Sequence, residues 1–178
     1  FIFLMSLSVA IAASAQTYPY QDASLTPEER AEDLLGRLSV EQKVMLMDYD
    51  SPEIPEFGIR KYNWWNEALH GSARNGLATV FPQAVGMAAS WNDELLEEVF
   101  DVASTEQRIK FSIARDEEGV RRYHGLTVWT PNLNIFRDPR WGRIAEGSGE
   151  DTYLDTQMGV AMVKGYQGET FDQTSMAA

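Results

Sequence analysis

Apolar positions at helical spacing predict four helices along the chain. The first begins after a capping box at residues 26–29 that has proline at the first helical position, and a similar box at residues 39–42 begins the second. The third helix begins at Asn92 and the fourth near Asp151. Their apolar stripes are Leu34, Leu35 and Leu38; Val44, Leu46 and Met47; Leu95, Leu96, Val99, Phe100 and Ala103; and Leu154, Met158, Ala161, Met162 and Gly165.

Two short runs rich in aromatic and β-branched residues, 62–65 and 126–129, predict strands. After Gly58 the order is therefore strand, loop, helix, strand, loop, helix, and the unusual residues lie in the loops that follow the strands. This order is typical of β/α architecture with a site at the carboxyl ends of the strands. A complete eightfold barrel needs about 250 residues. We therefore expect an α/β fold that comprises the first part of a (β/α)8 barrel, an incomplete barrel of two or three units.

The amino-terminal residues predict export. Residues 1–13 are nearly all apolar or small, and Ala13-Ser14-Ala15 before Gln16 matches the A-x-A pattern of signal peptidase sites. We predict a signal peptide at 1–15 that lacks its positive n-region, a helical lead-in at 16–57 and a partial barrel domain at 58–178. About 15 apolar residues are too few for a transmembrane span, which needs about 20. We expect no membrane insertion after cleavage, and a periplasmic or extracellular protein.

Composition narrows the class of ligand. The net charge of −12 argues against nucleic acid and anionic membranes as partners, and it is compatible with neutral, hydroxylated ligands. The chain has no cysteine, which excludes disulfides and thiolate metal sites. Hydrophobic residues make up 44% of the chain, a value typical of globular domains.

A charged, aromatic loop at residues 136–143, followed by Glu146, is the first candidate site. Such a loop either clamps the mouth of a barrel or holds a polar ligand against an aromatic face. Arg140 and Arg143 flank Trp141-Gly142, and a guanidinium offers a rigid fork of donors to vicinal hydroxyls or to a carboxylate. One of these arginines is expected to pair with Asp138 or Glu146. The spacing leaves open which arginine faces the ligand.

The second candidate site is the run of residues 62–71, which contains Trp65, Glu67 and His70. A carboxylate accepts two hydrogen bonds in one plane, as adjacent sugar hydroxyls require, and an aromatic face covers the apolar side of a pyranose. The alternative is an acid that caps the next turn. Glu67 and His70 also have the E-x-x-H spacing of di-iron bundles, but His124 has Arg121 in place of the second acid. We therefore predict no metal and no cofactor.

These motifs together resemble the N-terminal barrel domain of glycoside hydrolase family 3, in its β-xylosidase and β-glucosidase branches. The resemblance runs from Leu25 to Gly168 and rests on ordered motifs: residues 64–71, residues 81–83, residues 138–143 with Glu146, and Glu150-Asp151. It implies a retaining exo-β-glycosidase that acts at the non-reducing end of an oligosaccharide or β-glycoside, as in bacterial breakdown of plant polysaccharides.

The resemblance also implies roles for individual residues. Glu67 and Arg143 would bind hydroxyls of the terminal sugar. From the residues themselves, Trp65 and Trp129 are candidates to line the pocket, and Trp129 and Asn132 are equally compatible with closing it. The structural support of the site would come from Arg140, Glu146 and His70. Many β-glucosidases of the family carry aspartate in place of Glu67. The longer side chain would occupy space that a hexose hydroxymethyl group needs, which favours a pentose such as xylose.

The resemblance implies that the family's Lys-His pair, catalytic aspartate and general acid follow after the matched motifs, and none of the acids of this chain matches the family's catalytic positions. Retaining hydrolysis needs two carboxyl groups about 5 Å apart, so we expect the chain by itself to be inactive and the parent protein to be an enzyme. One alternative is a non-catalytic carbohydrate-binding or solute-binding protein that kept the sugar subsite. Another is an exported structural domain in which the tryptophans and arginines fill a core and form salt bridges.

Overall fold

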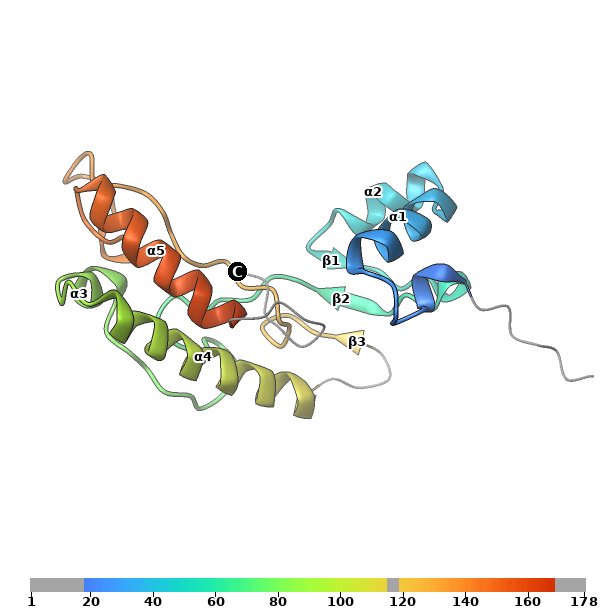
Figure 1. Cartoon of the computed structure of the whole chain (residues 1–178), viewed down its shortest axis with the longest axis horizontal. Helices are drawn as coiled ribbons and strands as arrows, with labels where there is room; N and C mark the ends of the chain where they lie inside the picture. The colour runs from blue at the N-terminus through green and yellow to red at the C-terminus, as the bar shows by residue number, and fades with distance from the viewer. Residues whose placement is uncertain (1–17, 115–118, 169–178) are drawn as a thin grey trace, which may run out of the picture. The chain divides into compact units, whose positions relative to one another are not determined.

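The computed structural model describes residues 18–114 and 119–168 and divides into two compact units, Phe1–Lys43 and Val44–Ala178 (Figure 1). The predicted signal peptide, residues 1–15, lies outside the described residues. The predicted domain boundary after residue 57 stays a prediction. Among the residues described, no helix is both long and apolar enough to span a bilayer.

The first unit contains the short 3-10 turn η1 (Pro19–Gln21) and helix α1 (Pro27–Arg37), and helix α2 (Val40–Leu46) crosses into the second unit. Both predicted capping boxes are confirmed. The Glu29 amide donates to the Thr26 hydroxyl at 3.2 Å and the Glu29 carboxylate accepts from the Thr26 amide at 2.9 Å. Ser39 and Gln42 exchange the corresponding pair of bonds at 2.9 and 3.2 Å. Local side-chain chemistry therefore determines where these helices begin.

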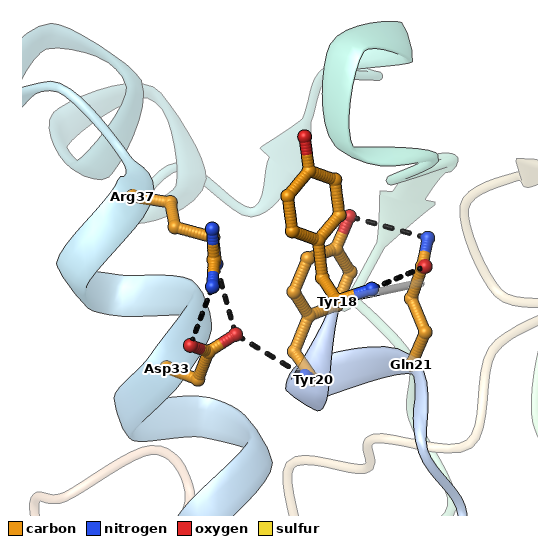
Figure 2. A network of polar contacts seen from close by, with 5 residues as sticks. All are labelled: Tyr18, Tyr20, Gln21, Asp33 and Arg37. Carbon is orange, nitrogen blue, oxygen red and sulfur yellow. Dashed lines mark hydrogen bonds and ion pairs between the residues drawn. The ribbon is translucent and has the colours of Figure 1, made fainter. Parts of the chain in front are cut away.

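A polar network attaches η1 to α1 (Figure 2). The Asp33 carboxylate accepts a two-pronged bond from Arg37, at 2.9 and 2.8 Å, and a third bond from the Tyr20 backbone amide at 3.2 Å. The Arg37 guanidinium lies 4.4 Å above the centre of the Tyr18 ring, which stacks on Tyr20. Hydrogen bonds from Arg37 lower the pKa of the Asp33 carboxyl. Within residues 18–43, aromatic and charged contacts hold η1 against α1.

Among the described residues, the apolar stripes of α1 and α2 are largely exposed. Neither helix contains a buried residue, and Leu35, Val44 and Met47 are 52%, 62% and 79% exposed. Only Leu38, the C-cap of α1, is buried. The reason is that, within the described part of the first unit, the single turn η1 is what packs on α1, and one turn covers little of a helix face.

The second unit contains a three-stranded sheet of β1 (Asp50–Ser51), β2 (Lys61–Asn63) and β3 (Gly119–Val120) in that order. Strand β1 runs antiparallel to β2, and β3 runs parallel to β2 with Tyr62 opposite Val120. The 3-10 turn η2 (Pro55–Phe57) connects β1 to β2. Mixed α/β structure is confirmed, whereas the (β/α)8 barrel stays a prediction.

The predicted strands differ from those observed. The run at 62–65 contributes only its first two residues to β2, and residues 126–129 are not part of any strand in the described chain. Hydrogen bonds from side chains stand here in place of the backbone–backbone bonds of a regular β-ladder. The Tyr62 hydroxyl accepts from the amides of Leu126 and Thr127 at 2.9 and 3.1 Å, and the Asn66 amide donates to the Thr127 carbonyl at 2.7 Å.

Helices α3 (Ala84–Ala88), α4 (Asp93–Ala114) and α5 (Thr152–Gln167) surround the main core, and a further 3-10 turn, η3, spans Ile144–Glu146. The predicted helix starts are confirmed, because Asn92 accepts from the Leu95 amide at 2.9 Å and Asp151 from the Leu154 amide at 2.7 Å. Helices α4 and α5 run side by side (Figure 1). Their shared buried side chains include Leu96, Phe100, Ala103, Met158, Met162 and Tyr166.

Candidate functional site

A cleft of about 790 Å3 in the second unit is lined by three stretches that lie far apart in the sequence, residues 65–74, 128–132 and 143–146, together with Gln83. It brings together nearly all of the site residues that the sequence predicts: Trp65, Glu67, His70, Trp129, Arg143 and Glu146. The exception is Arg140, which does not line the cleft.

The Glu67 carboxylate is paired with Arg74, whose Nε donates to Oε2 at 2.7 Å. This bond raises the pKa of the Arg74 guanidinium. The Ala73 amide donates to the Glu67 carbonyl at 2.9 Å and closes the loop, and Arg74 itself has a left-handed backbone with φ of 56°. Sequence reasoning missed Arg74, because an arginine seven residues after an acid has no characteristic spacing and only the closed loop brings the two together.

His70 fastens the same loop to the segment before α3. Its Nδ1 donates to the Phe81 carbonyl at 2.9 Å, and the Phe81 amide donates to the His70 carbonyl at 2.9 Å. The next residue, Gly71, has φ of 116°, and a Cβ there would lie 2.2 Å from the Thr79 carbonyl oxygen. Glycine is therefore required at this position, since any other residue would have both backbone strain and a collision.

Both arginines of the charged loop form ion pairs. Arg143 contacts Glu146 in a fork, with Nε donating to Oε1 at 2.8 Å and Nη2 to Oε2. These bonds lower the pKa of the Glu146 carboxyl, which also accepts a bond from Asn132 at 3.3 Å. Arg140 pairs with Asp138 in the same manner outside the cleft. The spacing left both arginines as candidates, and the structure places Arg143 in the cleft.

Tryptophans form an exposed aromatic surface beside these charges. Trp129 is 54% exposed, and its ring stacks on Trp64 at a centroid distance of 5.5 Å and an interplanar angle of 8°. Trp65 lies against the same ring at 5.0 Å, tilted by 34°. The Trp129 indole N–H donates to the Trp64 carbonyl at 3.2 Å. Because that bond restrains the indole, Trp129 presents a fixed aromatic face at the cleft.

The chemistry of the cleft follows from these pairs. Two carboxylates supply hydrogen-bond acceptors, two guanidiniums supply planar sets of donors, and their four charges cancel. The Arg143 guanidinium lowers the pKa of the Glu146 carboxyl, so this carboxylate accepts hydrogen bonds and is unsuited to donating a proton as a general acid. The cleft therefore fits a neutral ligand with several hydroxyl groups and one apolar face.

The family model described as "Glycosyl hydrolase family 3 N terminal domain" matches residues 41–178. The chain belongs to glycosyl hydrolase family 3. The family 3 match begins within α2 and includes every residue that lines the cleft.

Two relatives illustrate the similarity of this family 3 chain to xylosidases. It is 55% identical over 92% of its length to a xylan 1,4-beta-xylosidase from Xylanibacter ruminicola. It is 37% identical, also over 92% of its length, to beta-xylosidase/alpha-L-arabinofuranosidase 1 from Medicago sativa subsp. varia. The chain spans 19% and 21% of these two relatives, about a fifth of their length.

Solved structures of the family agree with the sequence relatives. A GH3 exo-beta-xylosidase, XlnD, in complex with a xylobiose aziridine activity-based probe is similar with a TM-score of 0.75 and 31% identity, over 89% of this family 3 chain and 21% of that one. The GH3 beta-glucosidase of Bifidobacterium adolescentis is similar with a TM-score of 0.60 and 29% identity, over 75% and 18% of the two chains.

Proposed function

We propose that this chain supplies the sugar-binding part of an exported, retaining exo-β-glycosidase that removes terminal non-reducing β-linked sugars during breakdown of plant polysaccharides. The observation that carries the proposal is the convergence of Glu67, Arg143 and Trp129, from three distant segments, on one cleft. Acceptors, donors and an aromatic face are what recognition of a pyranose requires.

Each cleft residue has a role in this proposal. Glu67 accepts hydrogen bonds from adjacent hydroxyls of the terminal sugar. Arg143, in the segment at residues 143–146, donates hydrogen bonds to hydroxyls of the same sugar. Trp65 and Trp129 cover the apolar side of the ring. His70 and Glu146 act through other residues: His70 holds the Glu67 loop against Phe81, and Glu146 holds the Arg143 guanidinium.

We further propose that the second unit is the first part of a (β/α)8 barrel, with the cleft at the carboxyl ends of its strands. Support comes from the position of the cleft, because Glu67 follows β2 and Trp129 follows β3 along the chain. Sites at the carboxyl ends of parallel strands are the rule in such barrels. Arg140 then contributes from outside the cleft, where its pair with Asp138 stiffens the loop that carries Arg143.

A β-xyloside is the preferred substrate in this proposal. Glutamate at position 67 reaches one methylene further into the cleft than aspartate would, into the region where a hexose carries its hydroxymethyl group. The xylosidase relatives and the xylosidase structure support the same preference, since they resemble this chain more closely than the beta-glucosidase does. When two substrates differ by one small group, a pocket can discriminate between them by about 10-fold or more in kcat/KM.

The test uses the full-length gene product that contains this chain, assayed on nitrophenyl β-xyloside and β-glucoside. We expect the xyloside to have the higher kcat/KM, and Glu67→Asp to lower the xyloside-to-glucoside ratio about 10-fold, because one methylene of space is opened. Glu67→Ala should abolish measurable activity on both substrates.

The matched control is Glu94→Asp, the same shortening on the exposed first turn of α4, which should leave the ratio unchanged. Hydrolysis of neither substrate would overturn the glycosidase proposal. A wild-type preference for the glucoside would overturn only the proposed xyloside specificity.

A further inference from the structure

The side chain of Asn66, directly before Glu67, is fully buried behind the cleft. Its amide nitrogen donates to the Thr127 carbonyl at 2.7 Å, and its amide oxygen accepts from the Gly125 backbone amide at 2.7 Å. The same nitrogen lies 3.4 Å from the Asn63 carbonyl as a weaker second contact. Every one of these partners is a backbone group, so the side chain joins two stretches of main chain.

The two stretches that Asn66 joins are those that carry Glu67 and Trp129. Strand β2 ends at Asn63 and residues 126–129 belong to no strand, so no regular ladder sets their spacing. Two backbone bonds link them, from the Trp129 amide to the Asn66 carbonyl at 3.0 Å and from the Tyr123 amide to the Trp65 carbonyl at 3.2 Å. The side-chain bonds of Asn66 add to these two bonds and help to set the register that a full ladder sets elsewhere in a sheet.

Close packing around Gly125 shows how tightly this spacing is set. A Cβ on Gly125 would lie 2.7 Å from the Asn66 amide nitrogen and 3.0 Å from the Asn63 carbonyl oxygen. Neither backbone stretch has room to move toward the other, and the amide bonds oppose movement apart.

We propose that Asn66 is a specificity-determining positioning residue, which sets the spacing of Glu67 and Trp129 and through it the preference for the smaller sugar. The inference rests on the proposed function for its substrate, and on the geometry of Asn66 for its mechanism. Asn66 does not line the cleft, so it acts only through the segments it joins.

An amide is the side chain that these contacts require. Thr127 presents an acceptor and Gly125 a donor, and asparagine satisfies both at once. Aspartate has no donor for Thr127 when ionised. Alanine leaves the half-buried Thr127 carbonyl and the buried Gly125 amide without these partners and opens a void, which frees the Trp129 segment to shift.

Tyr62 offers a second, milder way to loosen the same segment. Its hydroxyl accepts from the amides of Leu126 and Thr127, and Tyr62→Phe removes these bonds while it keeps the ring and its packing. The matched control is Ser104→Ala. The Ser104 side chain is as buried as that of Asn66. Its hydroxyl donates to the Tyr166 carbonyl at 2.9 Å, in the contact between α4 and α5 away from the cleft.

The experiment compares Asn66→Ala, Tyr62→Phe and Ser104→Ala in the full-length gene product. We expect Asn66→Ala to lower the xyloside-to-glucoside ratio of kcat/KM about 10-fold, because an enlarged cleft loses its discrimination against the larger sugar. Tyr62→Phe should shift the ratio in the same direction by a smaller factor, and Ser104→Ala should not shift it. The circular dichroism of the stacked Trp64–Trp129 pair should weaken in the first two variants only.

An unchanged ratio in Asn66→Ala, with a loss of stability like that of Ser104→Ala, would show a merely structural role and overturn the proposal. If Asn66→Ala does not fold, the ratio measured for Tyr62→Phe decides. If the wild type hydrolyses neither substrate, the proposed function has failed, and the tryptophan dichroism alone tests whether Asn66 sets the spacing.

Discussion

At the scale of single residues, the charged side chains that face the cleft are held before any ligand arrives. Glu67 is bonded to Arg74 and Arg143 to Glu146. Ion pairs as exposed as these contribute little to the free energy of unfolding, because water and salt screen them. Their contribution is positional: each pair fixes a flexible side chain in one rotamer, so less conformational entropy is lost when a ligand binds.

The Arg143–Glu146 pair leads to a prediction about pH. The arginine lowers the pKa of the Glu146 carboxyl below its ordinary value of 4.5, so the pair stabilises the folded protein above pH 4.5 and loses this effect as the pH falls through the lowered pKa. We expect Glu146→Gln to be less stable than wild type above pH 4.5, and the difference to close at lower pH. Urea denaturation of the full-length protein across this range measures it.

A control separates stability from binding in that experiment. Asp138→Asn breaks the comparable exposed pair with Arg140, outside the cleft. It should show the same kind of pH dependence and weaken the affinity for xylose less than Glu146→Gln does, because only Glu146→Gln releases the Arg143 guanidinium itself. Equal xylose affinities in the two variants would contradict the positional role.

At the scale of elements, the contact between α4 and α5 depends on the absence of a side chain. A Cβ on Gly165 would lie 2.5 Å from the Glu97 carbonyl oxygen and 2.7 Å from the Phe100 Cβ. The next residue, Tyr166, packs its ring against Phe100 and donates its hydroxyl to the Ala68 carbonyl, beside Glu67. Through the Tyr166 hydroxyl the helix pair contacts the backbone of Ala68.

Gly165→Ala is therefore predicted to destabilise the protein by about 1–3 kcal/mol, as overpacking of a close helix contact does. The matched control is Gly36→Ala in α1, where a new Cβ meets nothing within 4 Å. That variant should be neutral or gain up to about 1 kcal/mol from helix propensity. Thermal unfolding measures both, and equal effects of the two substitutions would argue against the close contact.

At the scale of the whole molecule, many apolar side chains of the second unit are exposed to solvent. Along α4, Val102, Ile109 and Ile113 are 45%, 55% and 80% exposed. Leu133 and Val160, which line a second, apolar cavity of about 550 Å3 against α5, are 58% and 48% exposed. Surfaces of this kind favour association or partial unfolding when they stay in water.

We accordingly predict that the 178-residue chain does not fold cooperatively when expressed alone. It should be insoluble, or soluble with a broad thermal transition and strong binding of a hydrophobic dye, as molten states show. Calorimetry and dye fluorescence, with the full-length gene product as the comparison, measure this. A single sharp, reversible unfolding transition of the short chain would refute the prediction.

The sequence by itself determined the features that depend on near neighbours. The helix starts at Thr26, Ser39, Asn92 and Asp151 rest on side chains that reach backbone amides three residues away, so they could be predicted without a fold. The ordered motifs likewise identified the family. Family membership follows from the amino-acid sequence and does not require the three-dimensional structure.

Only the tertiary structure decided which distant groups meet. It paired Glu67 with Arg74 and placed Arg143 rather than Arg140 in the cleft. It also replaced the strand predicted at 126–129 by bonds from Tyr62 and Asn66, more than fifty residues earlier in the chain. The physical reason is that these contacts depend on how loops close and how segments pack, and residue types and their spacing along the chain do not contain that information.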